Sequence, residues 1–208
     1  MFCTKKGTIK KTSLEKFSRP RSNGINAITI NEGDSLLEVK LTNGESHIMI
    51  GNRNGRAIRF DESKVRPMGR SAAGVRGMKL DGDEDEIVGM LSLPNESDEV
   101  TILAISENGN GKRTIFSEYS VTNRGGKGIK TLQVTDKTGK MVGLKAVNHD
   151  EDLMITTKNG IIIRMSMSDI SIMGRATQGV RVIKLNNGDQ ISDVAIVGKQ
   201  EENQDEEE

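Results

Sequence analysis

The chain has 208 residues, 34% of them hydrophobic, with 23 glycines, 3 prolines and only 2% aromatic side chains. This composition supports an ordered core and excludes collagen-like, proline-rich and aromatic-rich single-strand-binding proteins. The 30 basic and 30 acidic side chains cancel, so the overall charge predicts no preference for polyanions or polycations. Cys3 is the only cysteine, which excludes an internal disulfide framework. With no export-signal pattern and no apolar run near the roughly 20 residues that span a bilayer, we expect a cytoplasmic protein with no membrane partner.

Four copies of one unit follow each other along the chain, each marked by a turn glycine with a base four residues later. The turn glycines are Gly7, Gly55, Gly109 and Gly160, at spacings of 48, 54 and 51 residues. Three of them follow Asn and one follows Lys, and Asn-Gly pairs supply the positive φ angles of a tight hairpin. Short β-branched stretches flank the turns, as in residues 46–50 and 161–163. We therefore expect each turn glycine to join two antiparallel strands.

A second glycine, followed by a β-branched residue, comes 17 or 19 residues after each turn glycine. These pairs are Gly24-Ile25, Gly74-Val75, Gly128-Ile129 and Gly179-Val180. Apolar residues ten positions after the turn glycines predict core positions at Phe17, Val65, Tyr119 and Ile170. Each unit closes with a strand-like run, over 36–41, 87–93, 141–147 and 191–197. The repeats predict an all-β, propeller-like array of four blades of about 50 residues, at 1–41, 42–94, 95–149 and 150–200.

Three positions of the unit carry a base in nearly every copy, and we call them the first, second and third base columns. The first column reads Lys11, Arg59, Arg113 and Arg164. The second column reads Arg21, Arg70, Arg124 and Arg175, and the third reads Asn26, Arg76, Lys130 and Arg181. Eleven of the twelve residues are basic, against about two expected if charge were scattered. Equivalent sites in successive repeats form a belt, although for any single residue a solvated strand face is an equally good explanation.

Duplex nucleic acid fits a belt of repeating positive charge. Its phosphates recur along a curved path, and Lys or Arg from each blade can neutralise them with release of counterions. Arg adds bidentate recognition of phosphate, and backbone amides in the glycine-rich loop 122–128 can approach an anion closely. One Tyr, four Phe and no Trp leave no stacking platform for unpaired bases. The sequence therefore predicts largely sequence-independent binding of double-stranded DNA.

The last eight residues, 201–208, hold six acids and no base. The other 200 residues therefore carry 30 bases against 24 acids, a net charge of +6. An acidic run of this kind cannot bury apolar surface and predicts a disordered, solvated tail. A second interpretation, compatible with the first, is that the tail competes with polyanions for the basic surface.

No catalytic, metal or cofactor site is predicted. Asp81 opens a run with the spacing of a calcium loop, but Glu86 stands where such a loop needs Gly, and residues 109–114 lack the pattern of a phosphate loop. Two histidines and one cysteine are too few for a zinc cluster or a Cys/His nucleophile pair. Tyr119 shares its repeat position with other apolar residues, so packing explains it better than catalysis.

The repeated motifs resemble the C-terminal domain of bacterial DNA gyrase A. The resemblance covers residues 1–200 and rests on Gly-x-Ile-Lys-[Lys/Arg]-Thr, Ser-Glu-Tyr and Asn-Arg-Gly-Gly-Lys-Gly-Ile-Lys. It implies a β-pinwheel, a propeller-like disc whose blades exchange a strand with their neighbours and whose basic rim wraps duplex DNA. It also implies a parent type IIA topoisomerase that hydrolyses ATP and forms a heterotetramer with gyrase B. In that parent, wrapping directs negative supercoiling, while DNA cleavage and ATP hydrolysis reside elsewhere.

The sequence departs from the family pattern in two respects. The family usually has about six blades, and here only six residues precede Gly7, so we expect roughly two blades to be missing on the N-terminal side. The family's hallmark heptapeptide, Gln-Arg-Arg-Gly-Gly-Lys-Gly, has only a degenerate match in the third unit. That match is the box-like loop of Thr122, Asn123, Arg124, Gly125, Gly126, Lys127 and Gly128.

These departures leave two alternatives open. One is the corresponding domain of topoisomerase IV, whose heptapeptide is typically eroded. The other is a propeller-like scaffold for protein interactions, in which the bases serve solubility. An enzymatic propeller is disfavoured because acids do not recur at one position of each repeat.

Overall fold

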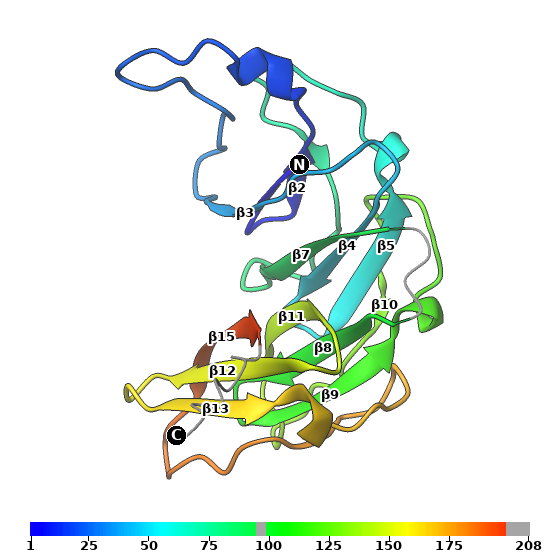
Figure 1. The fold of residues 1–208 in the computed structure, drawn as a ribbon, viewed down its shortest axis with the longest axis vertical. Coiled ribbons are helices and arrows are strands. Elements are labelled where there is room, and N and C mark those ends of the chain that lie inside the picture. The colour runs from blue at the N-terminus through cyan, green and yellow to red at the C-terminus, as the bar shows by residue number, and fades with distance from the viewer. Residues whose placement is uncertain (95–98, 199–208) are drawn as a thin grey trace, which may run out of the picture.

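The computed structural model describes residues 1–94 and 99–198. Over this range the protein consists of four antiparallel β-sheets and four short 3-10 helices, with no α-helix. The first sheet lies toward the top of Figure 1 and the second below it, and the third and fourth lie together at the bottom. The predicted all-β fold with four blades is confirmed, and no helix in the described ranges is long and apolar enough to cross a membrane. The predicted acidic tail lies outside the described residues.

Each sheet is built around a hairpin. The hairpins are β1 (Phe2–Thr4) with β2 (Thr8–Lys10), β4 (His47–Asn52) with β5 (Arg56–Asp61), β8 (Thr101–Ser106) with β9 (Asn110–Ile115), and β12 (Glu151–Thr157) with β13 (Ile162–Ser166). The strand-like runs that close each sequence unit form four further strands, which we call the inner strands. They are β3 (Leu36–Val39), β7 (Ile87–Leu93), β11 (Met141–Val147) and β15 (Ile191–Gly198). Each inner strand pairs with the first strand of its hairpin, and successive inner strands contact one another. The predicted hairpins and closing strands are therefore confirmed.

Three short strands, which we call the donated strands, cross from one unit to the sheet of the preceding unit. They are β6 (Val75–Arg76), β10 (Ile129–Lys130) and β14 (Val180–Arg181), which pair with β2, β5 and β9. Each is the outermost strand of its sheet, on the side away from the inner strands. The sheets are consequently offset by one strand from the sequence repeats, which is the exchange that the family resemblance implies.

The hairpin turns differ in type from the prediction. Among the described residues only glycines have positive φ, so Asn54 and Asn108 do not adopt the conformation that a two-residue Asn-Gly turn requires. In the second unit, the Gly55 amide donates to the Asn52 carbonyl at 3.0 Å, and Gly55 itself has φ of 75°. This is the geometry of a three-residue loop, a turn followed by a left-handed glycine.

The turn glycine also forms the contact with the next unit. The Gly55 carbonyl accepts hydrogen bonds from the amides of Thr131 and Leu132 at 2.8 and 3.0 Å, directly after the donated strand β10. A Cβ at Gly55 would lie 2.3 Å from the Leu132 carbonyl oxygen. Gly7 and Gly109 make the same pair of main-chain contacts with the units that follow them.

Apolar side chains fill the space between successive sheets, in three clusters that involve sheets one and two, two and three, and three and four. The predicted core residues Val65, Tyr119 and Ile170 are buried, whereas Phe17 is half-buried against Phe2. They follow the 3-10 helices η2 (Glu62–Lys64), η3 (Phe116–Glu118) and η4 (Met167–Asp169), and Phe17 ends η1 (Leu14–Phe17). Burial raises the pKa of the Tyr119 hydroxyl to about 12, as expected of a packed tyrosine.

We expect Gly55→Ala to destabilise the protein much more than Gly160→Ala. Both glycines have φ near +80°, so each substitution carries a conformational cost of about 1 kcal/mol. A methyl group at Gly55 also meets the Leu132 carbonyl, whereas nothing lies within 4 Å of a Cβ at Gly160. Urea unfolding should give a loss of about 2–4 kcal/mol for Gly55→Ala. Equal losses for the two variants would contradict the proposed role of the turn in joining units.

Candidate nucleic-acid interface

The first base column does not lie on the surface. Arg59 is only 7% exposed, and its Nε donates to Nδ1 of His47 at 2.9 Å. Its Nη1 donates to the carbonyls of Phe116 and Tyr119 at 3.2 Å each, and its guanidinium carbon lies 3.7 Å from the centre of the Phe116 ring. Arg59 thus extends from β5 and binds η3 of the following unit.

The other members of this column repeat the arrangement, except the last. Arg113 is 3% exposed and its Nε donates to the Ile170 carbonyl at the end of η4. The Lys11 ammonium lies between the Glu62 carbonyl and carboxylate of η2, at 3.0 and 3.4 Å. Arg164 is exposed and instead pairs with Asp152 of its own sheet at 2.8 Å.

The prediction that Arg59 and Arg113 face DNA is therefore wrong, and Lys11 is half-buried in an ion pair. Burial lowers the pKa of both guanidinium groups, and the hydrogen bonds to main-chain carbonyls offset the cost of removing them from water. The repeat pattern shows that these residues are equivalent in each unit. It does not show whether they are buried at the contact between two units, which we call the joint, or exposed on the outer surface.

The third base column, unlike the first, is exposed to solvent. Arg76, Lys130 and Arg181 are exposed on the donated strands β6, β10 and β14. They stand opposite Thr8, Arg56 and Asn110, which are the residues directly after each turn glycine. None of the three forms an ion pair with another described residue. We call these three residues the basic edge. Asn26, at the same repeat position, is exposed but lies in no strand.

Members of the second base column support the basic edge. The Arg124 Nη1 donates to the Arg76 carbonyl at 3.0 Å, and the Arg175 Nη1 donates to the Lys130 carbonyl at 2.5 Å. Both arginines are half-buried, so part of each guanidinium still faces solvent. Arg21 is exposed and Arg70 is half-buried.

Main-chain contacts fasten the box-like loop 122–128 to the preceding unit. The Thr122 amide donates to the Arg59 carbonyl at 2.8 Å and the Gly125 amide to the Gly77 carbonyl at 2.6 Å. The expectation that the loop amides bind an anion is therefore wrong for Gly125, whose amide is occupied within the protein. Lys127 remains 55% exposed, with its ammonium 2.7 Å from the Asp81 carboxylate.

Two buried lysines, which the sequence reasoning missed, hold the corresponding loops of other units. The Lys112 ammonium donates to the carbonyls of Gly174 and Arg175 at 2.6 and 2.5 Å, and Lys10 donates to the carbonyls of Ala27 and Arg70. Burial lowers the pKa of Lys112 to about 8. These lysines come three residues after a turn glycine, where the other two units have isoleucine. Because isoleucine occupies this repeat position in two of the four units, the sequence could have indicated that the position is buried.

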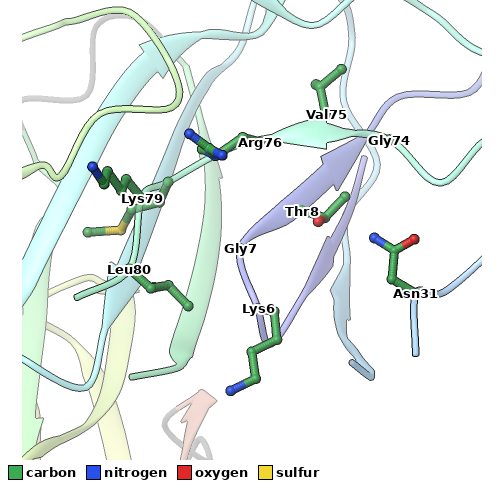
Figure 2. A pocket seen from close by; sticks show the side chains of 10 residues that line it. Lys6, Gly7, Thr8, Asn31, Gly74, Val75, Arg76, Lys79 and Leu80 are labelled. Atoms are coloured by element: carbon green, nitrogen blue, oxygen red, sulfur yellow. The ribbon is translucent and has the colours of Figure 1, made fainter. Parts of the chain in front are cut away.

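A cavity of about 540 Å³ lies beside the basic edge of the first sheet. Its lining includes Lys6 from the first turn, together with Arg76 and Lys79 from the second unit. Figure 2 shows these three side chains around the turn at Gly7. The Lys6 ammonium donates to the Asp83 carbonyl at 2.6 Å. The cavity is open and positively charged, which suits a phosphate group better than an apolar ligand.

Comparisons with known proteins agree with this architecture. A family model described as DNA gyrase C-terminal domain, beta-propeller, matches residues 1–43, 46–94, 101–148 and 151–198. The DNA gyrase A protein of Staphylococcus epidermidis is 47% identical over 203 residues, which are 98% of this chain and 22% of that protein. Its counterpart from Staphylococcus aureus strain MRSA252 is 47% identical over 209 residues, or 99% and 23%. This chain thus spans less than a quarter of these relatives.

Two solved structures share the fold. A DNA gyrase A C-terminal domain aligns with a TM-score of 0.80 at 28% identity, over 94% of this chain and 64% of that one. The C-terminal domain of a DNA topoisomerase IV aligns with a TM-score of 0.87 at 26% identity, over 95% and 61%. Both resemblances extend across all four sheets.

We expect Arg59→Leu to lower the free energy of unfolding by about 3 kcal/mol, because it removes the buried guanidinium that donates to the Phe116 and Tyr119 carbonyls and to the His47 imidazole. Arg76→Leu, on the exposed basic edge, should change it by no more than about 0.5 kcal/mol. Urea unfolding of both variants measures the difference. A loss for Arg59→Leu as small as that for Arg76→Leu would show that the joint contributes nothing to stability.

His47 should make stability depend on pH. It is 5% exposed, and burial, followed by the charge of Arg59, lowers the pKa of its imidazole. The unfolded chain then binds more protons than the folded protein below the ordinary histidine pKa of about 6.5. The free energy of unfolding should fall as the pH drops from 7 to 5, by at most about 1.4 kcal/mol per pH unit for this group.

Replacement of His47 by Gln should flatten that pH dependence. Replacement of the exposed His149 by Gln is the matched control and should leave it unchanged. The measurement is urea unfolding at several pH values. If His47→Gln keeps the wild-type slope, the dependence arises from another group.

Proposed function

Because the chain belongs to the DNA gyrase C-terminal domain family, we propose that it is a non-catalytic module that binds and wraps duplex DNA. The single observation that supports this most strongly is the basic edge, one exposed base at the same place in each of three successive sheets. A ligand with a repeated negative charge along a curved path satisfies all three bases together. Duplex DNA is such a ligand, and the number of bases contacted sets the salt dependence of its binding.

The half-buried arginines and the box-like loop complete the proposed surface. Arg124 and Arg175 hold the main chain of the basic edge and still present part of their guanidinium groups. Lys127, Arg21 and Arg70 add charge along the same set of loops. Bending a duplex by 40 to 90° over a short site costs on the order of 1–6 kcal/mol, so contacts from several sheets must act together. The proposed binding is independent of base sequence because these groups carry charge and no base-reading pattern.

The parent protein is the second part of the proposal. The relatives are DNA gyrase A proteins, so we propose that this module serves a type IIA topoisomerase that hydrolyses ATP and assembles with gyrase B in the bacterial cytoplasm. There it would direct strand passage toward negative supercoiling, and DNA cleavage would lie outside this module. Gyrase is preferred to topoisomerase IV because the matching family model and the relatives at 47% identity are DNA gyrase, whereas the solved gyrase and topoisomerase IV domains, at 28% and 26% identity, do not separate the two.

Two structural predictions remain part of this proposal. One is the division of the chain into blades at 1–41, 42–94, 95–149 and 150–200 within a disc of about six blades. The other is the acidic tail 201–208, which as a polyanion would compete with DNA for the basic edge.

Replacing Arg76, Lys130 and Arg181 together by Ala should weaken duplex binding and flatten its salt dependence. Each phosphate contact contributes about −0.9 to the slope of log affinity against log salt, so the slope should become less negative by about 3. Fluorescence anisotropy with a labelled duplex at several salt concentrations gives both quantities.

The matched control removes three exposed lysines that lie off the donated strands: Lys5, Lys137 and Lys158. It changes the net charge by the same amount and should leave the slope within about 1 of the wild-type value. Equal effects of the two triple variants would mean that net charge, and not the basic edge, drives binding. A wild-type slope near zero would contradict DNA binding itself.

A further inference from the structure

The loop that precedes β14 arches over Lys112 of β9. One end of this loop is bonded to the residue after Lys112, through the Met173 amide at 2.8 Å, and the other end pairs with the residue before it, through Val180. Residues 174–178 lie between these two ends and pair with no strand, and we call them the arch. The Lys112 side chain is fully buried and reaches the arch from the strand.

The Lys112 ammonium is saturated by the arch. An ammonium has three N–H donors, and the arch supplies three acceptors. They are the carbonyls of Gly174 and Arg175, at 2.6 and 2.5 Å, and the Thr177 hydroxyl, at 3.1 Å. No carboxylate within the described ranges forms an ion pair with Lys112. The ammonium therefore holds the main chain of the arch and has no donor left for a ligand.

The arch in turn determines where Arg175 lies. The Arg175 amide donates to the Glu118 carboxylate at 3.0 Å, and its carbonyl accepts from Lys112. Its Nη1 donates to the Lys130 carbonyl at 2.5 Å. The arch thus connects β9 of the third sheet with the donated strand β10 of the second sheet, and Arg175 lies between two successive positions of the basic edge.

The equivalent loop of the third unit is supported differently. Ile58 of β5 has the repeat position of Lys112, three residues after a turn glycine. The box-like loop lies over it, and a Cβ at Gly126 would be 3.6 Å from the Ile58 Cδ1 atom. Two consecutive glycines let that loop approach an apolar side chain. The arch has Ala and Thr at those two positions and directs two carbonyls at a donor, so it depends on the ammonium.

We propose that Lys112 is a positioning residue for DNA, whose ammonium shapes the arch so that Arg175 presents its guanidinium at the basic edge. This inference rests on the proposed DNA binding. Lys112 is buried and its donors are occupied, so it contacts no phosphate itself and acts through Arg175, which is only half-buried. Without the ammonium, the arch carbonyls lose their donor and the arch opens to reach water. Arg175 then moves away from the edge.

A double-mutant cycle tests this coupling, with the slope of log affinity for a labelled duplex against log salt as the readout. Arg175→Ala removes one phosphate contact and should make the slope less negative by about 1. Lys112→Met should give the same shift, although the lysine is buried. The two changes together should again shift the slope by about 1, because no guanidinium is left to position. Circular dichroism checks that each variant is folded.

Arg124→Ala provides the matched background, since Arg124 is the equivalent arginine of the loop that Ile58 supports. In that background Lys112→Met should add its full effect, for a total shift of about 2. A wild-type slope near zero would contradict the proposed DNA binding and this inference with it. With a steep wild-type slope, no shift in Lys112→Met, or a further shift when it is added to Arg175→Ala, would overturn this inference alone.

A pH series tests the same coupling without a Lys112 variant. Burial lowers the pKa of Lys112 to about 8; of the charged groups that face it, Glu118 of η3 raises this pKa and Arg175 of the arch lowers it. The neutral amine has two N–H donors for three acceptors, so the wild-type affinity for the duplex should fall between pH 7 and 9. Arg175→Ala should lose this fall, and an equal fall in that variant would overturn the inference.

The control for the pH series is Lys10→Met. Lys10 is the other fully buried lysine, and burial lowers its pKa as well, but it donates to Ala27 and Arg70 and not to the arch. In the Lys10→Met protein the difference in pH dependence caused by Arg175→Ala should persist. Loss of that difference would assign the pH dependence to Lys10 and overturn the role of Lys112.

Discussion

The strand that the second, third and fourth units each donate to the preceding sheet is the constraint on which the rest of the structure depends. β6, β10 and β14 are only two residues long, so their own ladder bonds cannot hold them in place. Main-chain bonds to the turn glycine, the close approach of the second glycine and a buried base at the joint all support the same short pairing. The first three sheets are therefore each completed by the unit that follows, as in other repeat proteins whose units do not stand alone.

This joint divides the bases of the repeat into two groups with different physical roles. Arg59 and Arg113 are buried and bind main-chain carbonyls across the joint, so their charge stabilises the arrangement of the sheets. Arg76, Lys130 and Arg181 stay in water on the donated strands. A phosphate can bind these exposed bases without breaking a protein contact, which is why the basic edge is the better candidate for DNA.

Much of the fold could be predicted from the repeats, because turn glycines and alternating apolar runs act locally. The hairpins at Gly7, Gly55, Gly109 and Gly160 were found in this way. The direction of the strand exchange could not be, since a two-residue strand has no periodicity. The sequence also does not show which bases are buried. The columns that contain Arg59 and Arg76 repeat with similar regularity, and only the contact of η3 with β5 shows that Arg59 is buried while Arg76 is exposed.

The central claim is that exposed bases on the donated strands bind DNA while the buried column joins the sheets. The most direct measurement is mass-spectrometric mapping of arginine and lysine modification, with and without a duplex. The account predicts that Arg76, Lys130 and Arg181 react in the free protein and are protected by DNA, whereas Arg59 and Arg113 are unreactive in both samples. Protection at Arg59 or Arg113, or an unprotected basic edge, would contradict it.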